Sequence, residues 1–158
     1  MLSALGAGAC GKQIGDNCIV GSDCSTNGTR QCDTSSKGGY CTIQGCDLGT
    51  CPTESTCVRF FTGAFANRPC DPRTEDVPAP GGANACSLDE LCTLDGQCAP
   101  RASEVRYCML TCASDSDCRD GYECRTLDLM KAHGGEPLLE AGMPVDDKSP
   151  KFCAVSGR

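Results

Sequence analysis

Apolar side chains in this chain occur in short runs that glycine, proline and polar residues interrupt. The runs that contain β-branched or aromatic residues are typical of short strands and lie at 40–43, 58–61 and 105–110. The dipeptides Asn-Gly, Gly-Gly and Asp-Gly, which favour tight turns, lie at 27–28, 38–39, 95–96 and 120–121. The pattern predicts short β-hairpins and little other regular structure.

One segment has helical spacing instead. The sequence LDLMKAHGG, residues 127–135, resembles one or two helical turns and is closed by Gly134, because glycine readily adopts the backbone conformation that ends a helix. No run approaches the roughly 18 apolar residues that a membrane-spanning helix needs. We therefore expect one short helix and no membrane span.

Bulky apolar residues are too few for an ordinary core. The chain has four Phe, three Tyr and no Trp, against 19 Gly and nine Pro. Such a chain buries little apolar area, so crosslinks must offset its conformational entropy. Cysteine supplies 17 of the 158 residues, a density typical of a disulfide scaffold in an oxidising compartment. We expect the cysteines to form the core and the protein to be extracytoplasmic.

Composition and charge narrow the partners. Zinc sites usually contain C-x2-C pairs or paired histidines, whereas this chain has no C-x2-C and one histidine, His133. The net charge of −7 argues against nucleic acid and anionic membrane surfaces, which attract clustered Lys and Arg. We expect no metal, no cofactor and no nucleic-acid partner.

The cysteine spacing indicates a duplication. Two sets of eight cysteines can be aligned, and the offset between corresponding members stays between 66 and 68 for seven of the eight. Tyr40-Cys41 then matches Tyr107-Cys108. The predicted disulfide framework is Cys18, Cys24, Cys32, Cys41, Cys46, Cys51, Cys57, Cys70, Cys86, Cys92, Cys98, Cys108, Cys112, Cys118, Cys124 and Cys153. We expect a small disulfide-rich fold of two tandem eight-cysteine modules, residues 18–70 and 86–153, whose connectivity recurs at matching positions.

Two segments fall outside this regularity. Residues 71–85, DPRTEDVPAPGGANA, combine extended proline backbone with flexible Gly-Gly, which is typical of a linker or of a surface loop bound to both modules. Residues 125–152 form an insertion that lengthens the last interval of the second module. The insertion either carries specificity or is a mobile loop without a role.

Cys10 is left over when two modules of eight are counted. The small residues Ala7, Gly8 and Ala9 precede it, as in a bacterial signal peptide whose cleavage exposes a cysteine for acylation. Residues 1–9 are then a signal-peptide remnant, with the true start upstream of Met1, and residues 10–17 a lipidated tether. Ala7 stands where the usual motif has Leu, so a free or intermolecular thiol, or cleavage just before Cys10, are the alternatives.

Together, the small-residue stretch that ends at Cys10 and the segments CASDSDCRDGYEC and FCAV resemble cysteine-rich bacterial lipoproteins of the myxobacterial type. The resemblance covers Cys10 to Cys153. It implies an exported, surface-exposed, disulfide-bonded lipoprotein, at the outer membrane or cell surface through its lipid anchor, and otherwise secreted.

Each module divides into two consecutive groups of four cysteines. By analogy with other small extracellular modules, we expect crossed pairing within each group, in which the first cysteine bonds to the third and the second to the fourth. The expected pairs are 18–32, 24–41, 46–57, 51–70, 86–98, 92–108, 112–124 and 118–153.

Catalytic and metal-binding chemistry has few candidates. His133 lies in the flexible context AHGGEP, and no G-x-S-x-G motif accompanies it, so a hydrolase that depends on His133 is a minor hypothesis. The four acidic residues of the segment 115–123 do not follow the EF-hand spacing, because Arg119 and Asp120 occupy the fifth and sixth positions. We interpret them as a solvated acidic turn and expect no enzyme.

Three of the four Phe residues, Phe60, Phe61 and Phe65, lie in VRFFTGAF. Core packing over the disulfides is the first interpretation, and contact with a partner is the second, because Phe60 and Phe61 would face opposite sides of a strand. The leading hypothesis is an exported, lipid-anchored protein that binds an extracellular protein or glycan or has a structural role. The alternative is a secreted protease inhibitor that presents 60–69 or the 125–152 insertion.

Overall fold

The computed structural model describes residues 11–65, 68–75 and 85–157. Its regular elements are short, and the longest strands have seven residues. The helical elements are α1 (Gly21–Cys24), η1 (Arg101–Ser103), η2 (Asp115–Asp117) and α2 (Leu127–His133). The strands are β1 (Gln31–Asp33), β2 (Tyr40–Thr42), β3 (Ser55–Phe61), β4 (Glu90–Cys92), β5 (Cys98–Pro100), β6 (Glu104–Leu110), β7 (Tyr122–Arg125), β8 (Glu136–Pro137) and β9 (Phe152–Val155). The small disulfide-rich fold with short antiparallel strands is therefore confirmed.

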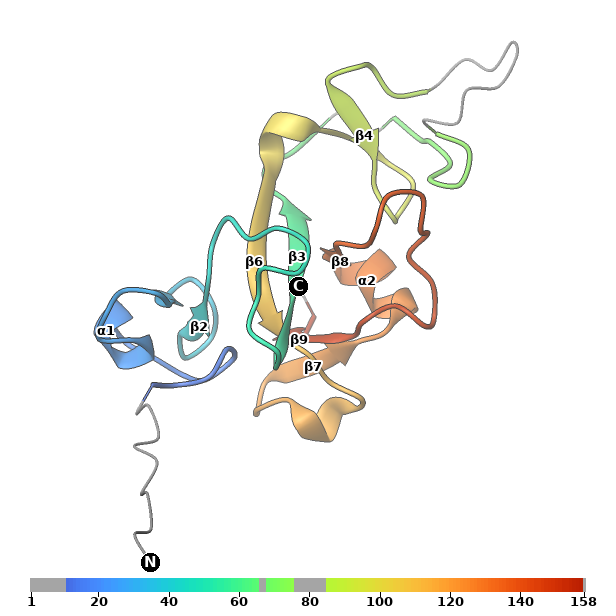
Figure 1. The fold of residues 1–158 in the computed structure, drawn as a ribbon. Coiled ribbons are helices and arrows are strands. Elements are labelled where there is room, and N and C mark those ends of the chain that lie inside the picture. The colour runs from blue at the N-terminus through green and yellow to red at the C-terminus, as the bar shows by residue number, and fades with distance from the viewer. Residues whose placement is uncertain (1–10, 66–67, 76–84, 158) are drawn as a thin grey trace, which may run out of the picture.

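The central sheet has the order β6-β3-β8 (Figure 1). Antiparallel pairing of β3 with β6 places Cys57 opposite Cys108 and Phe60 opposite Val105. β3 belongs to the first cysteine module, whereas β6 and β8 belong to the second. The two modules consequently share one sheet.

In the described part of the chain there are also three two-stranded antiparallel sheets: the hairpins β1-β2 and β4-β5, and the pair β7-β9, whose strands are separated by α2 and β8. The runs expected to be strands at 40–43, 58–61 and 105–110 correspond to β2, β3 and β6, and the predicted turn glycines have positive φ. Gly39 is the most constrained of these, since a Cβ there would lie 1.9 Å from the backbone oxygen of Cys18. The turn between β1 and β2 therefore needs glycine at this position.

The predicted helix is present as α2, and Gly134 ends it with φ of 78°. The short helices α1 and η2 were not predicted. Each is held by one carboxylate: Asp23 accepts hydrogen bonds from the backbone nitrogens of residues 19 and 20, and Asp117 from those of residues 113 and 114. Both acids lie directly before a cysteine, in the shared pattern C-x4-D-C.

All sixteen cysteines of the predicted framework are paired. The bonds are Cys18–Cys32, Cys24–Cys41, Cys46–Cys57, Cys51–Cys108, Cys70–Cys92, Cys86–Cys98, Cys112–Cys124 and Cys118–Cys153. Cys10 and its small-residue stretch lie outside the described residues.

Six of the eight expected pairs are correct and two are wrong. Cys51 bonds to Cys108 instead of Cys70, and Cys92 bonds to Cys70 instead of Cys108. The cause is the β3–β6 pairing, which brings Cys108 of the second module beside β3 of the first. The expectation that connectivity recurs at matching positions therefore holds for only two of the four bond types.

The crossed pattern itself survives with a different grouping. Every bond belongs to a set of four in which the first cysteine pairs with the third and the second with the fourth. The sets are 18/24/32/41, 46/51/57/108, 70/86/92/98 and 112/118/124/153. The third set lies in the chain between the third and fourth cysteines of the second, so the chain forms four crossed motifs, one nested inside another.

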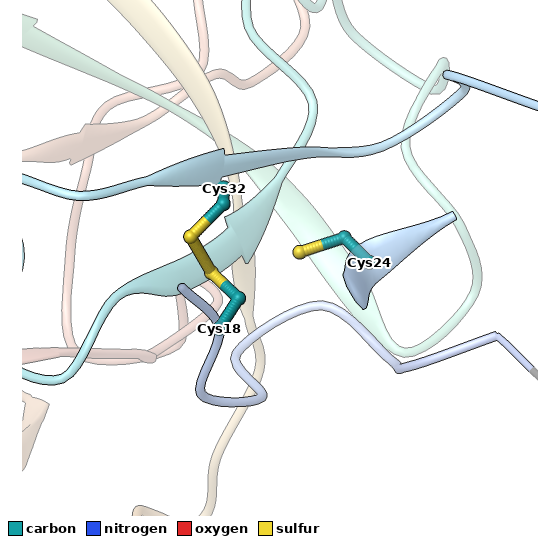
Figure 2. Close-up of side chains that lie close together, drawn as sticks. All are labelled: Cys18, Cys24 and Cys32. Atoms are coloured by element: carbon teal, nitrogen blue, oxygen red, sulfur yellow. A yellow bond between two sulfur atoms is a disulfide. The ribbon is translucent and has the colours of Figure 1, made fainter. Parts of the chain in front are cut away.

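Within each motif the two disulfides pack against each other. In the first, the Cys24 sulfur points toward the Cys18–Cys32 bond (Figure 2). Among the described residues, cysteines supply ten of the twenty buried apolar residues, as the scarcity of bulky side chains predicts. The main non-cysteine core includes Ile14, Val58, Met130 and Phe152. None of the helices in the described ranges is long and apolar enough to cross a membrane.

Candidate functional site

The β1-β2 hairpin is fixed to the rest of the fold by a few long-range hydrogen bonds. The Tyr40 hydroxyl donates to the backbone oxygen of Cys153 at 3.1 Å and accepts from the backbone nitrogen of Leu110 at 3.0 Å. The Thr42 hydroxyl donates to the backbone oxygen of Cys108 at 2.8 Å. The hairpin from the start of the chain therefore lies against β6 and β9.

Arg119 also holds the β1-β2 hairpin against the rest of the fold. Its guanidinium lies 4.2 Å from the ring centroid of Tyr122 and donates to the backbone oxygen of Lys37. The Tyr122 hydroxyl donates to the same Lys37 oxygen at 2.9 Å. Tyr40 and Tyr122 stack with centroids 5.5 Å apart, so one aromatic pair joins β2 to β7.

A cavity of about 250 Å3 lies between the docked hairpin and the remaining strands. All three tyrosines of the chain, Tyr40, Tyr107 and Tyr122, line it, together with Phe60. Its other lining residues are Asp33, Ser35, Ser36, Thr42, Met109, Arg125, His133, Ala154 and Val155. Small-molecule sites usually combine apolar and aromatic walls with a few convergent polar groups, which is the composition found here.

A larger groove, of about 740 Å3, is lined by parts of α2, β8 and residues 143–147. No aromatic ring lines it, and most of its polar lining is charged. The smaller aromatic cavity is therefore the better candidate for recognition of a ligand.

Asp33, at the end of β1, is the acidic group of the cavity. The Ser35 hydroxyl and the Ser36 hydroxyl donate to its two carboxylate oxygens at 2.6 and 2.7 Å, and the Ser35 backbone nitrogen donates at 3.0 Å. Partial burial opposes ionisation, but the serine hydrogen bonds outweigh it and lower the pKa of Asp33. The side chain is therefore a fixed, half-buried carboxylate.

His133, at the end of α2, also lines the cavity. Its Nδ1 lies 2.6 Å from Oε1 of Glu123, which in turn pairs with Nε of Arg125 at 3.3 Å. The buried Arg125 guanidinium also donates to the backbone oxygens of residues 133, 134 and 155. Desolvation lowers the pKa of Arg125, and Glu123 opposes that shift. Glu123 thus orients a histidine and balances an arginine at the cavity wall.

The phenylalanines have different positions. Phe60 packs edge-on against Phe152, with centroids 6.1 Å apart, and faces Tyr107 at 6.3 Å. Phe61 is half-buried with the Arg59 guanidinium 5.8 Å from its ring centroid, and Phe65 is half-buried. The interpretation as core packing fits Phe60, which is both core and cavity wall.

The acidic residues of the segment 115–123 are engaged in local structure. Asp115 accepts from the backbone nitrogen of Cys124 at 2.8 Å, Asp117 closes η2, and Glu123 contacts His133.

Three or more cysteine sulfurs also gather in each crossed motif, but every one of them is in a disulfide and offers no thiolate to a metal.

The linker and the insertion are held at several points. The Glu75 carboxylate accepts from the backbone nitrogen of Cys86 at 2.8 Å, which holds the two ends of the linker together, and residues 76–84 lie outside the described residues. In the insertion, Met130 is buried and Glu136 pairs with Arg59 across β8 and β3. In the other predicted inhibitor loop, residues 62–64 are exposed, and residues 66–67 lie outside the described residues.

Comparison with protein-family models, with curated proteins and with solved structures found no match to this chain. The chemistry of the cavity is therefore the basis for a functional conclusion.

Sequence reasoning named two of the cavity residues, His133 and Phe60, but did not bring them together. It did not identify the tyrosines or Asp33 as site residues. One signal was present in the sequence: two of the three tyrosines directly precede cysteines, at Tyr40-Cys41 and Tyr107-Cys108, so the disulfide frame holds them.

Proposed function

We propose that this protein is an exported, non-enzymatic binding protein of the cell surface, and that the tyrosine-lined cavity is its ligand site. The observation that carries the proposal is the convergence of all three tyrosines on one cavity between segments that disulfides fix. A crosslinked frame needs no ligand to become ordered, so little conformational entropy is lost when a ligand binds. The density of disulfides is typical of extracytoplasmic proteins.

Binding is favoured over catalysis by the hydrogen bonds of the cavity. His133 is oriented by Glu123 as a general base would be, but the nearby nucleophile candidates Ser35 and Ser36 direct their hydroxyls to Asp33. Within the described residues no hydroxyl or thiol is hydrogen-bonded to the His133 ring. A nucleophile needs such a contact with its base.

The lipid anchor at Cys10 is part of the proposal. Its support is the cysteine count: the sixteen cysteines of the framework pair with one another, and Cys10 is the seventeenth. The resemblance to cysteine-rich bacterial lipoproteins agrees with acylation there.

Intact mass tests this part. The chain is expressed with its upstream leader in a lipoprotein-competent host and weighed before and after alkylation without reduction. A mature chain that begins at Cys10, carries acyl mass and takes up no alkyl group supports the anchor. An unacylated chain with one alkylated thiol contradicts it.

Ligand binding is tested by saturation-transfer NMR with a set of neutral, cationic and anionic fragments. Saturable binding by wild type that is lost in Val155→Phe, which fills the cavity from a half-exposed position, supports the proposal. The matched control is Val20→Phe at an exposed site outside the cavity. Failure of every fragment class to bind contradicts it.

The protease-inhibitor hypothesis has its own signature. It predicts stoichiometric inhibition of a protease that Val155→Phe leaves unchanged, with slow cleavage in 60–69 or in the insertion. Such a result would replace the binding proposal.

A further inference from the structure

The geometry points to an organic cation, an ammonium headgroup, as the ligand of the tyrosine-lined cavity. This inference rests on the proposed function and adds the chemical class of the ligand. Three features of the cavity carry it: one carboxylate without a cationic partner, two aromatic rings in the same lining, and a volume suited to a headgroup.

The carboxylate is Asp33. Within the described residues, no Lys, Arg or His nitrogen lies within 4.0 Å of it. An ionised carboxylate has about four lone-pair sites, and the hydrogen bonds from Ser35 and Ser36 occupy three. The serines therefore hold the anion in place and keep it charged without neutralising it.

The basic groups that line the cavity, Arg125 and His133, share one carboxylate outside the lining, that of Glu123. Arg119 does not line the cavity; it lies over the Tyr122 ring and donates to backbone oxygens of the β1-β2 turn. Asp33 is thus the charge left for a ligand, and it disfavours an anionic one.

The negative charge of Asp33 also affects the pKa values of two tyrosines that line the cavity. Burial raises the pKa of Tyr107, and the negative charge of Asp33 adds to that shift. Burial also raises the pKa of Tyr122; Arg119 and a hydrogen bond with Ser36 oppose this shift, and Asp33 adds the smallest contribution. A cation placed among these rings would therefore lie in the field of the carboxylate.

Tyr107 and Phe60 provide the surface for the cation. Their ring centroids are 6.3 Å apart and the rings are inclined by 59°, so two aromatic rings meet at an angle in the cavity that Asp33 also lines. A cation within about 6 Å of an aromatic centroid is attracted by the ring quadrupole, and quaternary ammonium ligands are commonly bound in this way. The Tyr40–Tyr122 stack already holds one cation, Arg119.

The volume sets the size of the ligand. A cavity of about 250 Å3 is smaller than the roughly 300 to 1,000 Å3 of sites for drug-sized molecules. It suits a headgroup of a few heavy atoms, supplied either by a free amine or by a side chain of a partner.

Tyrosine emission gives a direct test, because the chain has no Trp and its three tyrosines all line the cavity. The probes are choline, n-butylammonium and 3,3-dimethylbutan-1-ol, the neutral analogue of choline in which carbon replaces nitrogen. We expect choline or n-butylammonium to change the emission saturably and to bind about tenfold more tightly than the neutral alcohol. Preference for choline indicates a quaternary headgroup, and preference for n-butylammonium a primary amine or lysine side chain.

Substitutions at Asp33 and Phe60 distinguish the contribution of the carboxylate charge from that of the aromatic ring. Asp33→Asn should reduce cation affinity by about tenfold and leave the alcohol unchanged, whereas Asp120→Asn, at an exposed carboxylate outside the cavity, should change neither. Phe60→Leu removes a ring but keeps apolar bulk, and provides a second test if Asp33→Asn fails to fold. Phe60→Leu should reduce the affinity for the two cations more than the affinity for the neutral alcohol.

The outcomes distinguish this inference from the proposed function. If cation and alcohol bind with equal affinity, and Asp33→Asn leaves both affinities unchanged, the inference of a cationic ligand is wrong. The cavity is then a binding site for apolar ligands. Binding of anions alone also overturns the inference of a cationic ligand but leaves the cavity as a binding site. Failure of all probes and of the wider fragment set overturns both.

Discussion

The rings of Tyr40 and Tyr122 stack with centroids 5.5 Å apart and an interplanar angle of 25°. Tyr40 belongs to the first disulfide motif and Tyr122 to the last, so this pair joins two motifs that are far apart in the sequence. The cavity exists because the β1-β2 hairpin is docked in this way, and the hydrogen bonds of Tyr40 determine how firmly it is held.

Tyr40→Phe should lower the free energy of unfolding by about 2 kcal/mol. The hydroxyl is buried, and its loss leaves the backbone oxygen of Cys153 and the backbone nitrogen of Leu110 without this partner. Urea denaturation with intact disulfides, followed by circular dichroism, measures the change.

Tyr107→Phe is the matched control for that measurement. Within the described residues the Tyr107 hydroxyl has no hydrogen-bond partner, so its loss should cost less than about 0.5 kcal/mol. Equal destabilisation by the two variants would show that the Tyr40 hydrogen bonds do not hold the hairpin.

The local part of this fold was predictable from the sequence. Four of the bonds, Cys18–Cys32, Cys46–Cys57, Cys86–Cys98 and Cys112–Cys124, span only 11 to 14 residues, a separation that a single turn region can close. The turn glycines, the strands β2, β3 and β6 and the helix α2 also follow from local patterns. Each depends only on residues close together in the chain.

The exchange of partners between Cys51, Cys70, Cys92 and Cys108 was not predictable in this way. It depends on the pairing of β3 with β6, and strand pairing between distant segments leaves no mark in cysteine spacing. The alignment at an offset of about 67 residues also concealed a second similarity, C-x4-D-C at 18–24 and 112–118. That pattern relates the first crossed motif to the fourth.

The candidate site was predictable only in parts. His133 and Phe60 were recognisable as unusual residues, but Asp33 resembled any turn carboxylate, because its serine partners form a common local turn. Its place in one cavity with Tyr107 and His133 depends on the docking of the hairpin, a long-range contact.

The exchanged disulfides can be mapped chemically. Non-reducing digestion followed by mass spectrometry should recover peptides that link Cys51 to Cys108 and Cys70 to Cys92. Recovery of Cys51–Cys70 and Cys92–Cys108 would instead establish two separately crosslinked modules. The local bond Cys86–Cys98 is an internal reference, because both arrangements contain it.

The same bonds should differ in their effect on stability. In the chain-entropy model, Cys51–Cys108 closes a loop of 57 residues and contributes about 4 kcal/mol, against about 3 kcal/mol for the 12-residue loop of Cys86–Cys98. Paired Cys→Ala variants of each bond, compared by denaturant unfolding, should preserve this order. A larger loss from the short loop would contradict it.

Substitution of Glu136, a buried charged residue of the insertion, should destabilise the fold. Its side chain is 6% exposed, and Oε2 accepts from Nη2 and Nε of Arg59 at 2.7 and 2.9 Å, while Oε1 accepts from the backbone nitrogen of Leu94. Glu136→Gln removes the charge that compensates Arg59 and should cost about 2 to 3 kcal/mol. Glu140→Gln, at an exposed position of the same segment, should be neutral, and equal unfolding midpoints would refute the role of this ion pair.

Asp23 and Asp117 should make the stability of the fold depend on pH. Hydrogen bonds from the backbone nitrogens, chiefly that of Ile19 for Asp23 and that of Ser114 for Asp117, lower both pKa values in the folded state. A carboxylate with a depressed folded pKa stabilises the fold above its unfolded pKa of about 3.9, and that contribution is lost as pH falls through the folded value.

The free energy of unfolding, measured in urea between pH 2 and pH 7 with intact disulfides, should therefore fall below about pH 4. In the double variant Asp23→Asn, Asp117→Asn the fall should be shallower, because asparagine retains an acceptor oxygen but does not titrate. Asp120→Asn, which leaves both helix-closing carboxylates in place, should keep the slope of the wild type. An unchanged slope in the double variant would mean that other carboxylates, Asp33 among them, account for the acid sensitivity.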